Sequence, residues 1–207
     1  MVATGKVLAT QSISLDGYSA GVKAGRDNPL GDDGERLHEW MVGLSAWRER
    51  HDMDGGDTNA DADAIDEVFA NLGAVIMGKT MFVTGEDPWG DEPPFHVPVF
   101  VLQHEPHDPI EKHGGTLFTF VHEGIEHALG LARRAAGDKD VLIAGGADAV
   151  QQYLSAGLID ELQIDLVPIV LGEGRRFFEN LPADLRLEPI RVVDGPGATH
   201  IRYRLIR

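Results

Sequence analysis

The stretch 141-VLIAGGADAVQQYLSA-156 decides the fold class, because it predicts a strand, a glycine turn and a helix in immediate succession. The apolar run at residues 141–144 is typical of a strand that is buried on both faces. Gly145 and Gly146 allow a tight turn, and the helical pattern of residues 147–156 is followed by Gly157. A strand that passes directly into a helix is the repeating unit of a parallel α/β sheet.

The same alternation extends over the rest of the chain. Apolar or alternating runs predict further strands at residues 6–14, 74–77, 97–103, 116–121 and 161–167. Apolar side chains at three- and four-residue spacing predict helices over 35–50, 61–72 and 123–136, the second of them capped by Asp61. Residues 185–193 and 199–206 flank an Asp-Gly-Pro-Gly turn and predict an antiparallel hairpin. We therefore expect one α/β domain over residues 1–207, with a mostly parallel sheet and this hairpin at one edge.

Composition excludes several classes of partner. The chain has 34 acidic and 18 basic side chains, and its formal net charge of −16 would repel nucleic acid and anionic lipid. It has no cysteine, so disulfides, thiol nucleophiles and cysteine-zinc sites are excluded. No apolar run approaches the roughly 18 residues that a membrane span requires. We expect a soluble, cytoplasmic protein.

Two motifs that would imply a bound ion or ATP are incomplete. The acidic stretch 51–63 resembles a calcium loop only in part, because it lacks the glutamate and the glycine at the required positions, and a solvated loop is expected instead. Gly78-Lys79-Thr80 lacks the upstream glycine of an ATPase P-loop, since Gly73 precedes the predicted strand. We expect no metal site.

Glycines follow two of the predicted strands, at the sheet edge where open α/β sheets bind ligands. Gly78-Lys79-Thr80 follows the strand at 74–77, and Gly145-Gly146-Ala147 follows the strand at 141–144. At both places glycine permits close backbone approach, and the helix that begins there offers free N–H groups to an anion. The sequence therefore predicts an anion site at this edge, although each motif taken alone is also found in an ordinary tight turn.

Six segments together resemble the dihydrofolate reductase-like superfamily. They are 12-SISLDG-17, 75-VIMGKTMF-82, 98-PVFVLQH-104, 143-IAGGA-147, 157-GLIDEL-162 and 167-VPIVLGEG-174, and the resemblance covers residues 6 to 206. Within the superfamily, the chain is most similar to the branch of the C-terminal reductase domain of the bifunctional riboflavin biosynthesis protein. This resemblance implies a three-layer fold with helices on both faces of the sheet.

The resemblance also implies an extended NADPH across the strand ends. It places the pyrophosphate on Gly145, Gly146 and Ala147, with Ala144 at the end of the strand before them. The adenosine phosphate end would meet Gly78, Lys79 and Thr80, and the ribose phosphate would meet His104 with Leu102 beside it. Asp16 and Gly17 would belong to the loop that closes over the nicotinamide.

The function implied is NADPH-dependent reduction of a small polar molecule that is pterin-, pyrimidine- or sugar-like. The alternative is a non-catalytic nucleotide or small-ligand binding protein with the same fold. Folate is disfavoured, because the first long helix offers only Glu35 and Glu39, without a clear apolar-flanked carboxylate to hold a pterin ring.

Candidate substrate residues are an acid and three aromatic side chains. Asp165 lies inside the apolar run 162–167, where a buried carboxyl could act as proton donor; the alternative is a polar strand face shared with Gln163. Trp40, Trp89 and Phe177 could line an aromatic pocket.

A homodimer is also expected. Ile201, Tyr203 and Leu205 alternate with polar residues in the last strand, an apolar pattern that a second subunit often covers. The resemblance to the riboflavin branch implies the same assembly.

Overall fold

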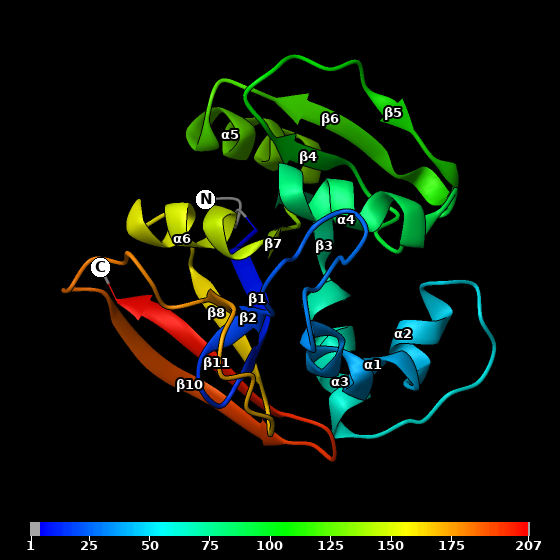
Figure 1. Cartoon of the computed structure of the whole chain (residues 1–207). Helices are drawn as coiled ribbons and strands as arrows, with labels where there is room; N and C mark the ends of the chain where they lie inside the picture. The colour runs from blue at the N-terminus through cyan, green and yellow to red at the C-terminus, as the bar shows by residue number, and fades with distance from the viewer. Residues whose placement is uncertain (1–4, 207) are drawn as a thin grey trace.

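The computed structural model describes residues 5–206. Their main feature is a nine-stranded sheet in the order β10-β11-β8-β1-β7-β3-β4-β6-β5 (Figure 1). Neighbours from β8 to β6 run parallel, whereas β10, β11 and β5 pair antiparallel. The strands are β1 (Val7–Ser14), β3 (Leu72–Gly78), β4 (Val99–Leu102), β5 (Ile110–Glu111), β6 (Leu117–Val121), β7 (Asp140–Gly145), β8 (Glu161–Val167), β10 (Arg186–Asp194) and β11 (Thr199–Ile206).

Helices cover both faces of this sheet, so the predicted three-layer α/β fold is confirmed. Helices α5 (Ile125–Ala136) and α6 (Ala147–Ser155) pack on one face in a core that includes Ile76. Helices α3 (Ala60–Phe69) and α4 (Lys79–Trp89) pack on the other face, where Val75 and Met77 lie. The strand period of two explains this division of β3 between two cores. No helix within the described residues is long and apolar enough to cross a membrane.

The single helix predicted over residues 35–50 is wrong. The structure has three short helices there: η1 (Gly34–Leu37), α1 (Glu39–Val42) and α2 (Ser45–Glu49). Leu44 is extended, with ψ 146°, and pairs with Asp57 in a β-bridge. The apolar positions of the stripe are still buried at Leu37 and Leu44, because the short helices turn them toward neighbouring elements one after another.

Helix α3 begins earlier than predicted, and its cap is Asn59 instead of Asp61. The Asn59 side-chain oxygen accepts hydrogen bonds from the Asp61 and Ala62 amides. Asp61 is therefore not the helix cap, and its side chain is buried inside the protein.

A small second sheet was not predicted. Strands β2 (Tyr18–Ala20) and β9 (Arg175–Arg176) pair antiparallel and join the loop after β1 to the segment after β8. Strands this short carry no periodic signal. A further short 3-10 turn, η2 (His113–Gly115), precedes β6.

The C-terminal hairpin is confirmed, but its apolar residues do not form the sheet edge. Strand β11 lies between β10 and β8, so β10 is the outer strand. Leu205 is buried in the core beside α5 and α6, and Tyr203 packs against that core. The expectation of an apolar edge made by Ile201, Tyr203 and Leu205 is therefore wrong.

Candidate functional site

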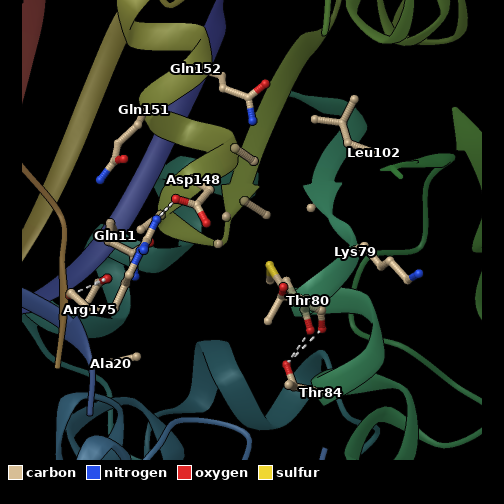
Figure 2. A pocket seen from close by; sticks show the side chains of 18 of the residues that line it. Gln11, Ala20, Lys79, Thr80, Thr84, Leu102, Asp148, Gln151, Gln152 and Arg175 are labelled. Carbon is tan, nitrogen blue, oxygen red and sulfur yellow. Dashed lines mark hydrogen bonds and ion pairs between the residues drawn. The ribbon is translucent and has the colours of Figure 1, made fainter. Parts of the chain in front are cut away.

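A cavity of about 1120 Å³ lies over the carboxyl ends of the parallel strands (Figure 2). Four of its residues lie at or next to strand ends, and these are Gly78 of β3, Leu102 of β4, Val121 of β6 and Ala144 of β7. Gln11 comes from the middle of β1. The opposite wall comes from the segment after β2, including Leu30 and His38. Open α/β sheets bind their ligands at this edge, so the cavity is the candidate site.

Three helix N-termini meet at this cavity without side-chain caps. One is that of α5, which follows Gly124. The other two follow glycines that the sequence predicts for the cofactor: Gly78 precedes α4 and Gly146 precedes α6, and neither end has a side-chain hydrogen bond to its first amides. A Cβ atom added to Gly146 would meet nothing within 4 Å. Gly145 has φ +127°, a conformation that favours glycine, and the Gly145–Gly146 peptide bond is cis. The free N–H groups of both helices are available to an anion such as a diphosphate.

The charges on the cavity wall differ from those of the chain as a whole. The chain has 34 acidic residues. Among residues 5–206, which the structure describes, Asp148 is the only acidic residue that lines the cavity. Lys79 and Arg175 are the basic residues there, and Arg175 forms an ion pair with Asp148. Figure 2 shows this pair beside Gln11, with Lys79 across the cavity. A wall with so few acidic groups favours an anionic ligand over a cationic one.

Nine of the predicted cofactor residues line the cavity together. They are Gly78, Lys79, Thr80, Leu102, His104, Ala144, Gly145, Gly146 and Ala147. The fold brings them together because β3, β4 and β7 are neighbouring parallel strands that end at the same edge.

Asp16 and Gly17 lie outside the cavity. The Asp16 carboxylate accepts hydrogen bonds from the Leu171 and Gly172 amides at 3.1 and 2.7 Å. A hydrogen bond from the Ser14 side chain, together with these amides, lowers the pKa of Asp16 to about 2 against the opposing effect of burial. In this structure the loop after β1 is thus held to the segment after β8.

The three aromatic candidates do not line the cavity and do not lie together. The Trp40 ring packs against His200 at 5.2 Å, and the Trp89 ring packs against Phe95 at 5.0 Å. Phe177 is fully buried in the core beside α6. The predicted aromatic pocket is wrong, because each ring is used to fill a separate apolar cluster.

Asp165 is buried, as predicted for a central strand, but it does not line the cavity. Its Oδ1 atom accepts hydrogen bonds from Gln163 Nε2 at 3.0 Å and from His200 Nδ1 at 2.7 Å. His200 Nε2 lies 2.8 Å from Asp61 Oδ1, so the imidazole bridges two buried carboxylates. Burial by itself lowers the pKa of His200, but the two carboxylates raise it more, and the net shift is upward. His200 is therefore protonated on both ring nitrogens, and the cation lies between the carboxylates of Asp165 and Asp61.

His38 is a cavity residue that sequence reasoning missed. It lies between η1 and α1, it is half-buried, and it lines the cavity with Gln11 and Ser19. Burial lowers the pKa of His38 to about 4, and the charge of Asp165 opposes this shift. One histidine inside the helix predicted over residues 35–50 gives no local signal of a site, and only the tertiary fold brings it to the cavity.

The family model of the RibD C-terminal domain matches residues 5–199. The chain belongs to the RibD C-terminal domain family. Among solved structures, a riboflavin biosynthesis protein of Shewanella sp. PV-4 has TM-score 0.69 and 22% identity, covering 98% of this chain and 99% of that one. Acinetobacter baumannii RibD has TM-score 0.62 and 18% identity over 99% of this chain and 59% of its own. Enterococcus faecalis dihydrofolate reductase, solved with NADP(H), has TM-score 0.58 and 14% identity over the full length of both chains.

Curated relatives of this RibD C-terminal domain protein are matched over part of their length. The uncharacterized Bacillus subtilis protein YwjB is 25% identical over 126 residues, which are 58% of this chain and 67% of YwjB. YyaP of the same organism is 28% identical over 85 residues, which are 41% of this chain and 45% of YyaP. The match thus spans less than half of YyaP. Family and neighbours point to a reductase-type fold, which confirms the predicted resemblance.

Proposed function

We propose that this protein is an NADPH-dependent reductase of a small polar molecule. The observation that carries the proposal is the meeting of the uncapped N-termini of α4, α5 and α6 in one large cavity, where Asp148 is the one acidic side chain on the wall among residues 5–206. A dinucleotide has a diphosphate at its centre and needs free N–H groups there, together with room on either side for two ring systems. Similarity in fold to a dihydrofolate reductase that binds NADP(H) supports the same assignment.

The cavity residues fit such a cofactor. Backbone N–H groups at Gly146 and Ala147 would hold the diphosphate, with those at the start of α4 beside them. Lys79 and His104 would meet the phosphate on the adenosine ribose, as proposed from the sequence. When bound, NADPH supplies a hydride to the substrate; the protein binds, orients and shields the reactants.

The substrate would occupy the end of the cavity near β1. The wall there has uncharged polar groups, including Gln11, Ser19 and Gln151, and the Arg175–Asp148 ion pair lies beside Gln11. Hydrogen-bonding groups of this kind suit a small polar ring. Glu35 and Glu39, the carboxylates considered for a pterin, are exposed and do not line the cavity. These features favour a pterin-, pyrimidine- or sugar-like molecule held by hydrogen bonds to these polar side chains.

Two measurements separate a reductase from a protein that only binds its ligand. Titration with NADPH, followed by cofactor fluorescence, measures binding. Oxidation of NADPH, followed by absorbance across a panel of pterin, pyrimidine and sugar-like compounds, measures turnover. Binding with turnover of a panel compound supports the reductase, and binding without any turnover supports the alternative. Failure to bind NADPH contradicts the NADPH-dependent reductase and leaves only a protein that binds another ligand.

Lys79→Ala is expected to reduce the preference for NADPH over NADH by at least about tenfold. One hydrogen bond to a charged group contributes about 1.5–3 kcal/mol, and only NADPH has the added phosphate. Dissociation constants for both cofactors measure the ratio. Lys139→Ala removes the same charge from an exposed site outside the cavity and serves as the control. An unchanged ratio in Lys79→Ala would place the phosphate elsewhere.

We also propose a homodimer. The outer strand β10 exposes Ile190 and Val192, which are apolar side chains at 37% and 62% exposure. Covering such groups is a common reason for self-association. Light scattering should give twice the chain mass, and a single-chain mass at micromolar concentration would contradict the dimer.

A further inference from the structure

One ion pair joins two parts of the cavity wall beside the N-terminus of α6. Arg175 lies in β9 and Asp148 lies in the first turn of α6, and both residues line the cavity. Their oppositely charged groups are in contact, as Figure 2 shows. Asp148 follows Gly146 and Ala147, whose amides are proposed above to hold the cofactor diphosphate. The ion pair therefore lies where the proposed ligand carries its diphosphate charge.

The backbone of Arg175 is held firmly, whereas its side chain is not packed away. Strand β9 pairs with β2, and the Ser19 hydroxyl donates a hydrogen bond to the Arg175 carbonyl at 3.2 Å. The buried Gln151 side chain of α6 donates to the next two carbonyls, those of Arg176 and Phe177, at 3.1 and 2.8 Å. The Arg175 side chain itself is 44% exposed. Because its base is fixed and its side chain is long, Arg175 can change rotamer between two nearby anions without a change in the fold.

Asp148 is the only acidic side chain on the cavity wall among residues 5–206. A carboxylate in the first turn of a helix interacts favourably with the helix dipole, so it competes with an anion bound at the same N-terminus. It also repels that anion directly, because the two like charges lie at short range. The Asp148 side chain is 70% exposed, and solvent weakens this repulsion without removing it. Asp148 therefore opposes the anion binding that the neighbouring amides favour.

We propose that Asp148 competes with the cofactor diphosphate for the Arg175 guanidinium and thereby regulates how tightly the cofactor is held. The inference rests on the proposed function, because it takes the α6 N-terminus as the diphosphate subsite. Arg175 turns from Asp148 to the diphosphate when the cofactor binds, and its planar guanidinium can donate two parallel hydrogen bonds there. Asp148 then loses its partner. Breaking the ion pair opposes cofactor binding, so the cofactor dissociates more readily than it would from a site without Asp148.

The first test measures cofactor affinity in single variants by fluorescence titration. Asp148→Asn removes the competing charge and is expected to bind NADPH about tenfold more tightly than the wild type, whereas Arg175→Gln should bind it about tenfold more weakly. Asp63→Asn removes the same charge from the first turn of α3, and Arg186→Gln removes a guanidinium from β10. Both control residues are exposed and lie outside the cavity, so the dissociation constant should change by less than about twofold. Unchanged or weaker binding by Asp148→Asn would overturn the competition.

The second test asks whether the two side chains act on the cofactor through each other. In the Asp148→Asn background no ion pair has to be broken, so Arg175→Gln should cost about fivefold more affinity there than in the wild type. The double variant Asp148→Asn/Arg175→Gln completes this double-mutant cycle. Equal losses in both backgrounds would show that the two residues act independently and would contradict the competition.

The third test observes the guanidinium itself. The Arg175 Nε–Hε signal in 1H–15N spectra is identified by its loss in Arg175→Gln. We expect this signal to differ between the wild type and Asp148→Asn before nucleotide is added. At saturating NADP+ it should coincide in the two proteins, because the diphosphate is then the partner of Arg175 in both. A difference that persists at saturation would show that Arg175 stays with Asp148, and the exchange would be wrong.

These outcomes separate the inference from the proposed function. A wild type that binds neither NADPH nor NADP+ contradicts the proposed function and this inference with it. Cofactor binding whose strength does not respond to Asp148→Asn, or responds equally to Asp63→Asn, overturns the inference alone.

Discussion

Gly146→Val is expected to weaken NADPH binding by at least about a hundredfold and to leave the protein folded. Gly146 has φ −67° and ψ −174°, which valine adopts readily, and its added Cβ would meet nothing within 4 Å. The side chain would therefore extend into the cavity, where a phosphate must approach the α6 amides. Blocking those N–H groups removes several charge-assisted hydrogen bonds together, each of them about 1.5–3 kcal/mol.

The control for this variant is Gly43→Val. Gly43 also has open space around its Cβ position and a negative φ, −85°, but it lies outside the cavity. Fluorescence titration with NADPH and thermal melting by circular dichroism should show both variants folded and only Gly146→Val unable to bind. Undiminished binding by Gly146→Val would mean that the cofactor does not use the α6 N-terminus.

Asp61→Ala is expected to lower the free energy of unfolding by about 3–5 kcal/mol, the usual cost of removing one partner from a buried ion pair. Asp61 Oδ1 contacts His200, and its Oδ2 accepts a hydrogen bond from the Gly197 amide at 2.8 Å. The carboxylate thus ties α3 to β11 and to the turn before it. Without it, a charged imidazole stays buried with one partner, and the Gly197 amide loses its acceptor.

Asp63→Ala provides a matched control for this loss. Asp63 belongs to the same first turn of α3, so both substitutions remove an acidic group near the helix N-terminus, but Asp63 is exposed. Urea denaturation should give a large loss for Asp61→Ala and a loss below about 1 kcal/mol for Asp63→Ala. Equal losses would show that only the helix dipole is involved.

The pH dependence of this contribution follows from the raised pKa of His200. A group whose pKa is raised on folding stabilises the protein fully below its unfolded pKa of about 6.5. That stability is lost as the pH rises through the folded pKa. The gap in unfolding free energy between wild type and His200→Gln should therefore shrink as the solution becomes alkaline, and a gap that widens would show that His200 is buried uncharged.

Regular elements were predictable from the sequence, because their patterns are local. The strand at β8 and the glycine turn before α6 follow from apolar runs and from glycines at their ends. The prediction of one helix over residues 35–50 was wrong, because the same apolar stripe is also compatible with three short helices that each bury a part of it. Nothing local to that stripe shows that Leu44 pairs with Asp57.

The part of the candidate site that lies at strand ends was predictable from the sequence. The part that depends on which face of the sheet a side chain occupies was not. The backbone groups of Gly78 and Gly146 reach the cavity whichever way the strands turn. For Asp165, the strand period showed that it shares a face with Gln163 but not which face meets the cavity. His38 was missed since its position depends on how η1 and α1 pack, a property of the whole fold.

Strand β1 lies near the middle of the sheet, although it comes before the other described strands in the sequence (Figure 1). Its partners are β7 and β8, and the hydrogen bonds from Lys6 to Asp140 and to Glu161 span 134 and 155 residues. During synthesis β1 therefore cannot pair with β7 and β8 until most of the described chain has been made. Closing loops of this length is entropically costly, so refolding is expected to be slow, on the order of milliseconds to seconds. A chain that stops before β8 would leave one side of β1 as an open apolar edge, ready to associate with other chains.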